Sequence, residues 1–202
     1  MTELPRLRKS TSSCLTEPIV RFLVKTHITP NTLTWLGFSI ALVAAVVIAT
    51  GHPFIAGFIV LAAGFFDMLD GALARHTGRV TPFGAVLDST LDRVSEAVLL
   101  LGVLIFYLLS GNQPTLGILF VSLALIASPL VSYLRAKGEA LGIECRVGLF
   151  TRPERVIALA IGLLASRVID YALIIALVVI AVFSFVTAGQ RLLYLKRQTK
   201  TK

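Results

Sequence analysis

Long apolar segments dominate this chain and decide which solvent it can fold in. Six can be traced, at residues 31–50, 53–75, 82–110, 114–141, 153–166 and 168–193. All but the fifth reach the ~20 residues that a helix needs to cross a bilayer. Because lipid offers the backbone no hydrogen-bond partner, such segments must be helical. They predict an all-α integral membrane protein with six transmembrane helices.

Charge and composition agree with that class. Only 15% of residues are charged, against about 25% in an average soluble domain. The net charge is +8, and the basic residues cluster before the first segment, between the second and third, between the fourth and fifth, and at the end of the chain. This distribution follows the positive-inside rule. It predicts a multi-pass protein of the cell membrane with both termini in the cytoplasm, and it argues against nucleic acid as the partner.

The first 29 residues precede the apolar segments and contain a second helical pattern. Apolar residues fall on one helical face, while Glu17, Arg21 and Lys25 lie elsewhere; the apolar set is Leu15, Ile19, Phe22 and Leu23. This pattern predicts a juxtamembrane amphipathic helix in the cytoplasmic interface; a loosely ordered basic tail is the alternative. We expect one domain over residues 1–202, with the interfacial helix in 1–29, the six-helix bundle in 30–195 and a basic cytoplasmic tail in 196–202.

Four aspartates interrupt this apolar chain. Asp67 and Asp70 are three residues apart and Asp88 and Asp92 are four apart, so each pair lies on one helical face. The short connection between the second and third segments makes these helices antiparallel neighbours, and all four carboxylates then meet at the cytoplasmic end of the hairpin. Charged groups in a membrane need compensation. Oxygen ligands favour Mg²⁺, Mn²⁺ or Ca²⁺, and two ions would suit four carboxylates and a phosphate substrate.

A longer pattern contains these aspartates. It reads Asp67-x2-Asp70-Gly71-x2-Ala74-Arg75-x8-Gly84-x3-Asp88-x3-Asp92. At every fixed position it resembles the signature of the CDP-alcohol phosphotransferase (CDP-alcohol phosphatidyltransferase) family. The run Pro30-Asn31-x2-Thr34 at the first segment is similar to the family as well. This resemblance implies an enzyme in which an alcohol displaces CMP from a CDP-linked lipid, using Mg²⁺ or Mn²⁺, as two ions, in a homodimer.

The resemblance also implies a role for each matched residue. Asp67, Asp70 and Asp88 would hold the metal, and Asp92 would act as the catalytic base and also contact a metal ion. The residues that would contact the CDP-lipid are Asn31, Thr34, Asp70, Gly71, Ala74, Arg75 and Gly84. No residue is placed as a covalent nucleophile, which favours direct displacement. A network of carboxylates paired to Arg75, Arg79 and Arg93 is the purely structural alternative.

Basic residues around the fourth to sixth segments indicate the acceptor. Their concentration on the side of the carboxylates predicts an anionic alcohol that carries its own phosphate. Three runs, Ser132-Tyr-x-Arg135-Ala-x-x-Glu139, Arg152-Pro-Glu-Arg155 and Gln190-Arg191, resemble the phosphatidylinositol phosphate synthase branch of the family, which uses inositol 1-phosphate with CDP-diacylglycerol. By that resemblance the acceptor would be bound by Ser132, Arg135, Arg155 and Arg191. Arg135 stands where the branch often has lysine, which keeps the charge but changes the geometry.

Several alternatives stay open on the sequence. Glycerol 3-phosphate is also an anionic acceptor, and nothing in the apolar segments distinguishes a diacyl lipid from an archaeal ether lipid. A cation transporter would also place carboxylates in a membrane, but such sites lie near the bilayer midplane in paired halves. Here the aspartates lie near one surface. A non-catalytic relative is disfavoured because all four aspartates are present.

Overall fold

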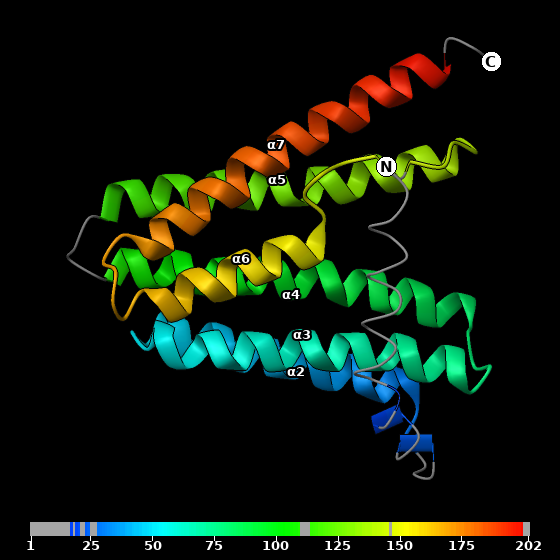
Figure 1. Cartoon of the computed structure of the whole chain (residues 1–202), viewed down its shortest axis with the longest axis horizontal. Helices are drawn as coiled ribbons and strands as arrows, with labels where there is room; N and C mark the ends of the chain where they lie inside the picture. Colours follow the sequence, from blue (N-terminus) through cyan, green and yellow to red (C-terminus); the bar gives the residue numbers. More distant parts are fainter. Residues whose placement is uncertain are drawn as a thin grey trace.

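The chain folds into a bundle of helices, with labels as in Figure 1. The computed structural model describes residues 17, 19, 20, 23, 24, 28–109, 114–145 and 147–199. Within these residues the long helices are α2 (Pro30–Ala49), α3 (Pro53–His76), α4 (Pro82–Leu109), α5 (Pro114–Ala140), α6 (Arg152–Ala165) and α7 (Ala172–Thr199). Proline occupies the first turn in all but α7, where its missing N–H has no helical partner to lose.

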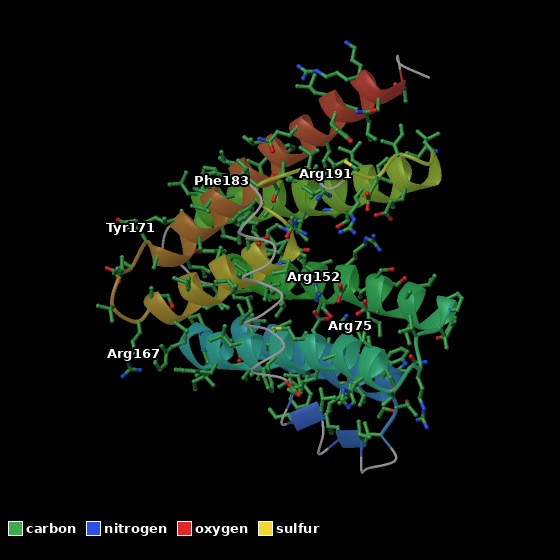
Figure 2. The ribbon with its side chains drawn as sticks, turned by 45° about the vertical axis from the view of Figure 1, so that its right-hand side comes forward. Arg75, Arg152, Arg167, Tyr171, Phe183 and Arg191 are labelled. Atoms are coloured by element: carbon green, nitrogen blue, oxygen red, sulfur yellow. The ribbon has the colours of Figure 1, made fainter. Side chains whose placement is uncertain are left out.

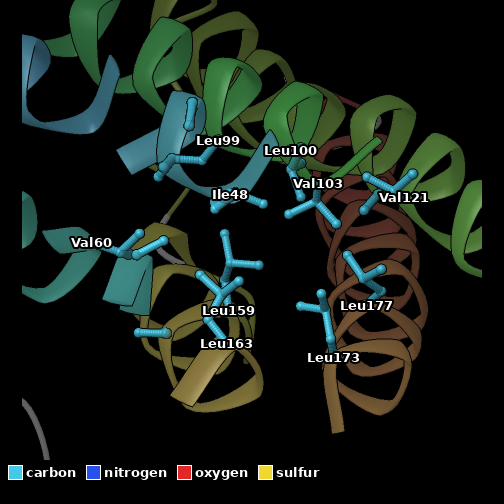
Figure 3. Packing of buried hydrophobic residues seen from close by; sticks show 14 of the residues in the cluster. Ile48, Val60, Leu99, Leu100, Val103, Val121, Leu159, Leu163, Leu173 and Leu177 are labelled. Carbon is cyan, nitrogen blue, oxygen red and sulfur yellow. The ribbon is translucent and has the colours of Figure 1, made fainter. Parts of the chain in front are cut away.

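The helices pack as an α2–α3–α4 layer joined to α5, α6 and α7. α2 contacts α3 and α4, α5 contacts α4 and α7, and α6 bridges α3 and α7. Small residues allow the closest approaches: a Cβ added at Gly102 of α4 would lie 2.5 Å from the carbonyl oxygen of Ala45 in α2. The apolar core between the layers draws on all six helices (Figure 3), with Ile48, Val60, Leu100, Val121, Leu163 and Leu177 among its buried members.

α6 begins inside the bundle. Figure 1 shows the chain returning from the end of α5 to the middle of the molecule before α6 starts. The backbone N–H of Thr151 donates to the Glu154 carboxylate at 2.9 Å, and the Thr151 hydroxyl donates to the same carboxylate. These two hydrogen bonds satisfy polar groups of Thr151 at a helix start that would be costly to leave unpaired. The first turn of α6 is thereby held at the level of the carboxylates of α3 and α4.

Four of the helices are long and apolar enough to cross a membrane: α2, α3, α5 and α7. The first half of α4 is too rich in charge for that description, since it contains Asp88, Asp92, Arg93 and Glu96. α6 has 14 residues, about 21 Å of helix at 1.5 Å per residue, against about 30 Å of hydrocarbon. The all-helical membrane class is therefore supported, while six complete spans remain a prediction.

The ends of the chain add two observations. The described N-terminal residues 17, 19, 20, 23 and 24 are helical, and Val20 is buried against Leu33, Leu69 and Leu73. Leu15 and Phe22 of the predicted interfacial helix lie outside the described residues, so that helix remains a prediction. The last helix starts at Ala172, after a turn at 166–171, and continues through 196–199 into the segment assigned to the basic tail. Residues 200–202 of that tail lie outside the described residues.

Candidate active site

Three carboxylates meet where α3 ends and α4 begins. Asp67, Asp70 and Asp88 each offer an oxygen, and these atoms all lie within 4.8 Å of one another. Two unit charges at that distance repel by about 3 kcal/mol at an effective dielectric constant of about 20. Asp70 is 4% exposed, and its Oδ2 is buried without a hydrogen-bond partner among the described residues. An all-oxygen set with an unsatisfied buried oxygen fits Mg²⁺ or Mn²⁺.

An arginine from α6 links this group to the fourth aspartate. Arg152 Nη1 lies 2.7 Å from Asp67 Oδ2 and 2.5 Å from Asp92 Oδ1. Figure 2 shows Arg152 at the start of α6, facing the α3–α4 hairpin, on the same side as Arg75. The structural alternative of pairing to Arg93 is not favoured, because Arg93 Nη1 donates to the Ser89 carbonyl at 2.7 Å. Asp92 therefore stands beside the three-carboxylate group, with Arg152 as its partner.

The residues assigned to the CDP-lipid surround the same hairpin. Thr34 of α2 interacts with the Asp70 side chain. Asn31 lies against Gly84, where an added Cβ would be 3.3 Å from the Asn31 amide oxygen. Gly84 thus lets the starts of α2 and α4 approach each other.

The remaining residues of this set lie on the last turns of α3. A Cβ added at Gly71 would be 3.2 Å from Arg75 Nη1, so the absence of a side chain makes room for the guanidinium group. Arg75 is exposed and acts electrostatically on Asp88. Ala74 is half-buried one turn after Asp70. The surface beside the carboxylates therefore has no bulky side chain at Gly71 and presents the Arg75 guanidinium group. Such a group can donate hydrogen bonds to a diphosphate.

A second ion pair lies deeper between α4 and α6. Arg155 Nε donates to Glu96 Oε1 at 2.5 Å and Arg155 Nη2 donates to Glu96 Oε2 at 2.7 Å. Arg155 is 2% exposed and Glu96 is 8% exposed. Removing one partner of such a buried pair leaves a charge without compensation, at a cost of roughly 3–5 kcal/mol.

The other predicted acceptor residues fall into two groups. Arg191 of α7 is buried and donates to the carbonyls of Val147, at 2.8 Å, and Val131, at 2.5 Å. It lies near enough to Arg135 and Arg155 for their charges to act on it. Arg135 is exposed and pairs with Glu139 at 2.9 Å. The arginines therefore gather around one region, although Arg135 lies at its exposed edge.

Two clefts border these groups. The carboxylate cleft, of about 410 Å³, lies between α2, α3, α4 and α6, and its polar lining is Thr34, Asp67, Asp92, Ser95, Glu96 and Arg152. The serine cleft, of about 250 Å³, lies between α4 and α5, and its polar lining is Arg93, Glu96, Ser128 and Ser132. Glu96 borders both. The predicted acceptor residue Ser132 thus lies one side chain away from the carboxylate cleft.

This geometry can be compared with known proteins. The family model for CDP-alcohol phosphatidyltransferase matches residues 27–186. The chain belongs to the CDP-alcohol phosphatidyltransferase family. The match confirms the resemblance seen in the aspartate signature and makes the chain a transferase of phosphate-containing groups. It also removes the cation transporter as an interpretation of the carboxylates.

Individual family members are similar over most of their length. A phosphatidylinositol phosphate synthase of Mycobacteroides abscessus is 38% identical over 189 residues, which cover 92% of this chain and 86% of the relative. An archaetidylinositol phosphate synthase of Methanothermobacter thermautotrophicus is 38% identical over 169 residues, 83% of each chain.

Solved structures of the family share the fold. The phosphatidylinositol phosphate synthase of Mycobacterium tuberculosis with CDP-DAG bound has a TM-score of 0.82 and 34% identity, covering 89% of this chain and 92% of that one. The same enzyme in complex with manganese and citrate has a TM-score of 0.83 and 34% identity, covering 89% and 88%. The fold is therefore that of the family, and one solved member of the family holds manganese.

Three residues of the site were not predicted from the sequence. Arg152 was counted among the basic residues that indicate an anionic acceptor and opens the run Arg152-Pro-Glu-Arg155, but its contact with Asp67 and Asp92 was not predicted. Glu96 continues the spacing of Asp88 and Asp92 by one more turn, but the resemblance ends at Asp92. Ser128 carries no local signal beyond lying one turn before Ser132.

Proposed function

We propose that this chain is a phosphatidylinositol phosphate synthase, which transfers the phosphatidyl group of CDP-diacylglycerol to a hydroxyl of inositol 1-phosphate. The observation that carries the proposal is the group formed by Asp67, Asp70 and Asp88, whose oxygens lie within 4.8 Å of one another beside a region that gathers arginines. The Mycobacteroides abscessus relative, named for this reaction, supports the choice of acceptor.

Asp67, Asp70 and Asp88, with Asp92 at their edge, would hold two Mg²⁺ or Mn²⁺ ions. The Mycobacterium tuberculosis relative in complex with manganese supports that metal class. When bound, such ions neutralise the diphosphate and stabilise the charge that builds on the leaving phosphate. Asn31, Thr34, Asp70, Gly71, Ala74, Arg75 and Gly84 would position the CDP-lipid, with Arg75 as the donor to its phosphates.

The acceptor hydroxyl would attack the phosphorus that carries the lipid. Asp92 would take the proton from this hydroxyl as the new O–P bond forms and the O–P bond to CMP breaks. CMP leaves with the electron pair of that bond, so no covalent enzyme intermediate forms. Ser132, Arg135, Arg155 and Arg191 would bind the inositol 1-phosphate and hold its hydroxyl near Asp92.

The lipid donor has one supported alternative. An archaetidylinositol phosphate synthase is as similar to this chain, at 38% identity, as the bacterial relative. A CDP-linked ether lipid is therefore the second candidate donor for the same reaction. Glycerol 3-phosphate is retained as the competing acceptor, because its phosphate would meet the same arginines.

The membrane arrangement completes the proposal. All six helices α2–α7 would cross the cell membrane, and the N-terminal segment would lie as an interfacial helix on the cytoplasmic surface. Residues 1–202 form one domain that acts as a homodimer, with both termini and the carboxylates facing the cytoplasm. The positive-inside distribution of basic residues supports this orientation.

The test is CMP release by the purified protein in detergent with Mg²⁺. Each donor, CDP-diacylglycerol or its ether-linked counterpart, is combined with inositol 1-phosphate, glycerol 3-phosphate or free inositol. We expect release with inositol 1-phosphate and little with the other two. Release with glycerol 3-phosphate alone would overturn the acceptor, and a preference for the ether donor would change the lipid class.

A further inference from the structure

Glu96 is a buried carboxylate for which the proposed reaction has no chemical role. It lies on α4 one turn beyond Asp92, so Asp88, Asp92 and Glu96 follow one face of the helix at intervals of four residues. From α6, Arg152 reaches Asp92 and Arg155 reaches Glu96. α4 and α6 run in the same direction (Figure 1), so the two ion pairs follow one another along both helices in the same order. The first pair adjoins the metal site, and the second adjoins the acceptor residues.

The Glu96–Arg155 contact uses one edge of the guanidinium group. A guanidinium carries five N–H donors in a fixed plane. Nε and Nη2 each give one donor to Glu96, which leaves two on Nη1 and one on Nη2. One N–H of Nη1 and the remaining N–H of Nη2 form the end of the fork, the edge that binds phosphate in a bidentate manner. Glu96 therefore fixes the rotation of Arg155 and leaves its phosphate-binding edge available.

The Nη1 side of that edge of Arg155 is buried and is left without a hydrogen-bond partner in the part of the chain that the structure describes. The Ser128 hydroxyl, which lines the serine cleft together with Glu96, is also buried without a partner in that part of the chain. Unpaired buried donors are costly, so a ligand that supplies oxygens is the expected partner. The phosphate and hydroxyl groups of a phosphorylated polyol would supply such oxygens.

We propose that Glu96 is the positioning residue of the acceptor site: it orients Arg155 so that its free edge receives the phosphate of the acceptor. This inference rests on the proposed function for the identity of the acceptor. It does not depend on whether the polyol is inositol or glycerol, because both carry the phosphate that Arg155 would bind.

Charge and positioning predict opposite results for Glu96→Gln. If Glu96 only neutralised the pocket, its removal would leave more positive charge and would lower the KM for inositol 1-phosphate. If Glu96 positions Arg155, the KM for inositol 1-phosphate should rise by about 10-fold or more. The KM for CDP-diacylglycerol should stay within about 2-fold of the wild-type value. An unchanged or lower acceptor KM would overturn the proposal.

Two variants complete the design. Glu96→Asp keeps the charge but is shorter by one methylene, and we expect an acceptor KM between those of the wild type and Glu96→Gln. If Glu96→Gln does not fold, Glu96→Asp carries the test, and a wild-type acceptor KM for it would refute the positioning role. Glu144→Gln, at an exposed position, is the control for loss of one carboxylate and should change neither KM.

The experiment separates this proposal from the proposed function. Turnover of the wild type with glycerol 3-phosphate alone would refute the inositol assignment, and the same KM comparison would then be made with glycerol 3-phosphate. If the wild type turns over neither acceptor, calorimetric titration with inorganic phosphate replaces the kinetics. Binding that is about 10-fold weaker in Glu96→Gln would support the positioning role. Equal binding would overturn it.

Discussion

Replacing Asp70 by asparagine should stabilise the metal-free protein and remove most of its stabilisation by metal. Asp70 is 4% exposed, and its oxygens lie within 4.8 Å of those of Asp67 and Asp88. Each of these pairs repels by about 3 kcal/mol at an effective dielectric constant of about 20. Solvent and Arg152 screen the half-buried neighbours, so we expect a net gain of about 1–3 kcal/mol for Asp70→Asn. For a protein of this size that corresponds to about 3–9 °C in Tm.

The assay is thermal unfolding in detergent, with a chelator and with saturating Mg²⁺. Metal at 100 times its Kd stabilises the folded state by about 2.7 kcal/mol, so the wild type should become more stable when Mg²⁺ is added. Asp70→Asn should show less than about a third of that increase. The difference in Tm between the two proteins should therefore shrink or reverse when Mg²⁺ replaces the chelator. Asp170→Asn, at an exposed position in the turn before α7, is the matched control and should follow the wild type.

Two results would refute this reasoning. A lower Tm of Asp70→Asn in chelator would mean that the three carboxylates do not repel one another in the folded protein. An undiminished Mg²⁺ response would mean that the metal binds elsewhere.

Three further predictions concern neighbouring residues. Asp92→Asn should retain binding of CDP-diacylglycerol, measured by titration, and should lose at least about 100-fold in kcat; normal turnover would exclude it as the base. Arg152→Gln should tighten Mn²⁺ binding in the absence of lipid by about 3-fold or more, measured by paramagnetic resonance, because it frees two carboxylates, whereas Arg167→Gln on the far side should leave it unchanged. Gly102→Ala should lower the Tm by several degrees, because its Cβ would lie 2.5 Å from a carbonyl oxygen of α2. Gly189→Ala, with open space around it, is the control and should leave the Tm unchanged. Equal Tm values for the two variants would contradict the close packing of α2 and α4.

The carboxylate group was predictable because its geometry is local. Asp67, Asp70 and Asp88 lie on two helices joined by a short connection, so helical periodicity and one turn suffice to bring them together. The starts of α2 to α6 were also predictable, because a proline in the first turn is a local signal. The family signature then added the expected roles of the metal and lipid residues, which stay predictions.

The contacts of Arg152 and Arg155 were not predictable because they depend on how deep in the bundle α6 begins. Arg152 and Asp67 are 85 positions apart in the chain, and their contact requires α6 to begin in the middle of the bundle. Topology rules count the arginines of this connection as cytoplasmic charges and do not state how deep in the bundle their side chains lie. The pairing of Glu96 with Arg155 depends on the same depth, so a single sequence gives no signal for it.

We propose that Asp67, Asp70 and Asp88 hold the divalent metal on which phosphatidyl transfer depends. Anomalous diffraction from crystals soaked in Mn²⁺ tests it most directly, because manganese scatters anomalously and the protein's oxygens do not. We predict manganese peaks within about 2–2.5 Å of carboxylate oxygens of all three aspartates. Peaks at other residues only, or no peak in crystals of protein that releases CMP in the presence of Mn²⁺, would contradict the account.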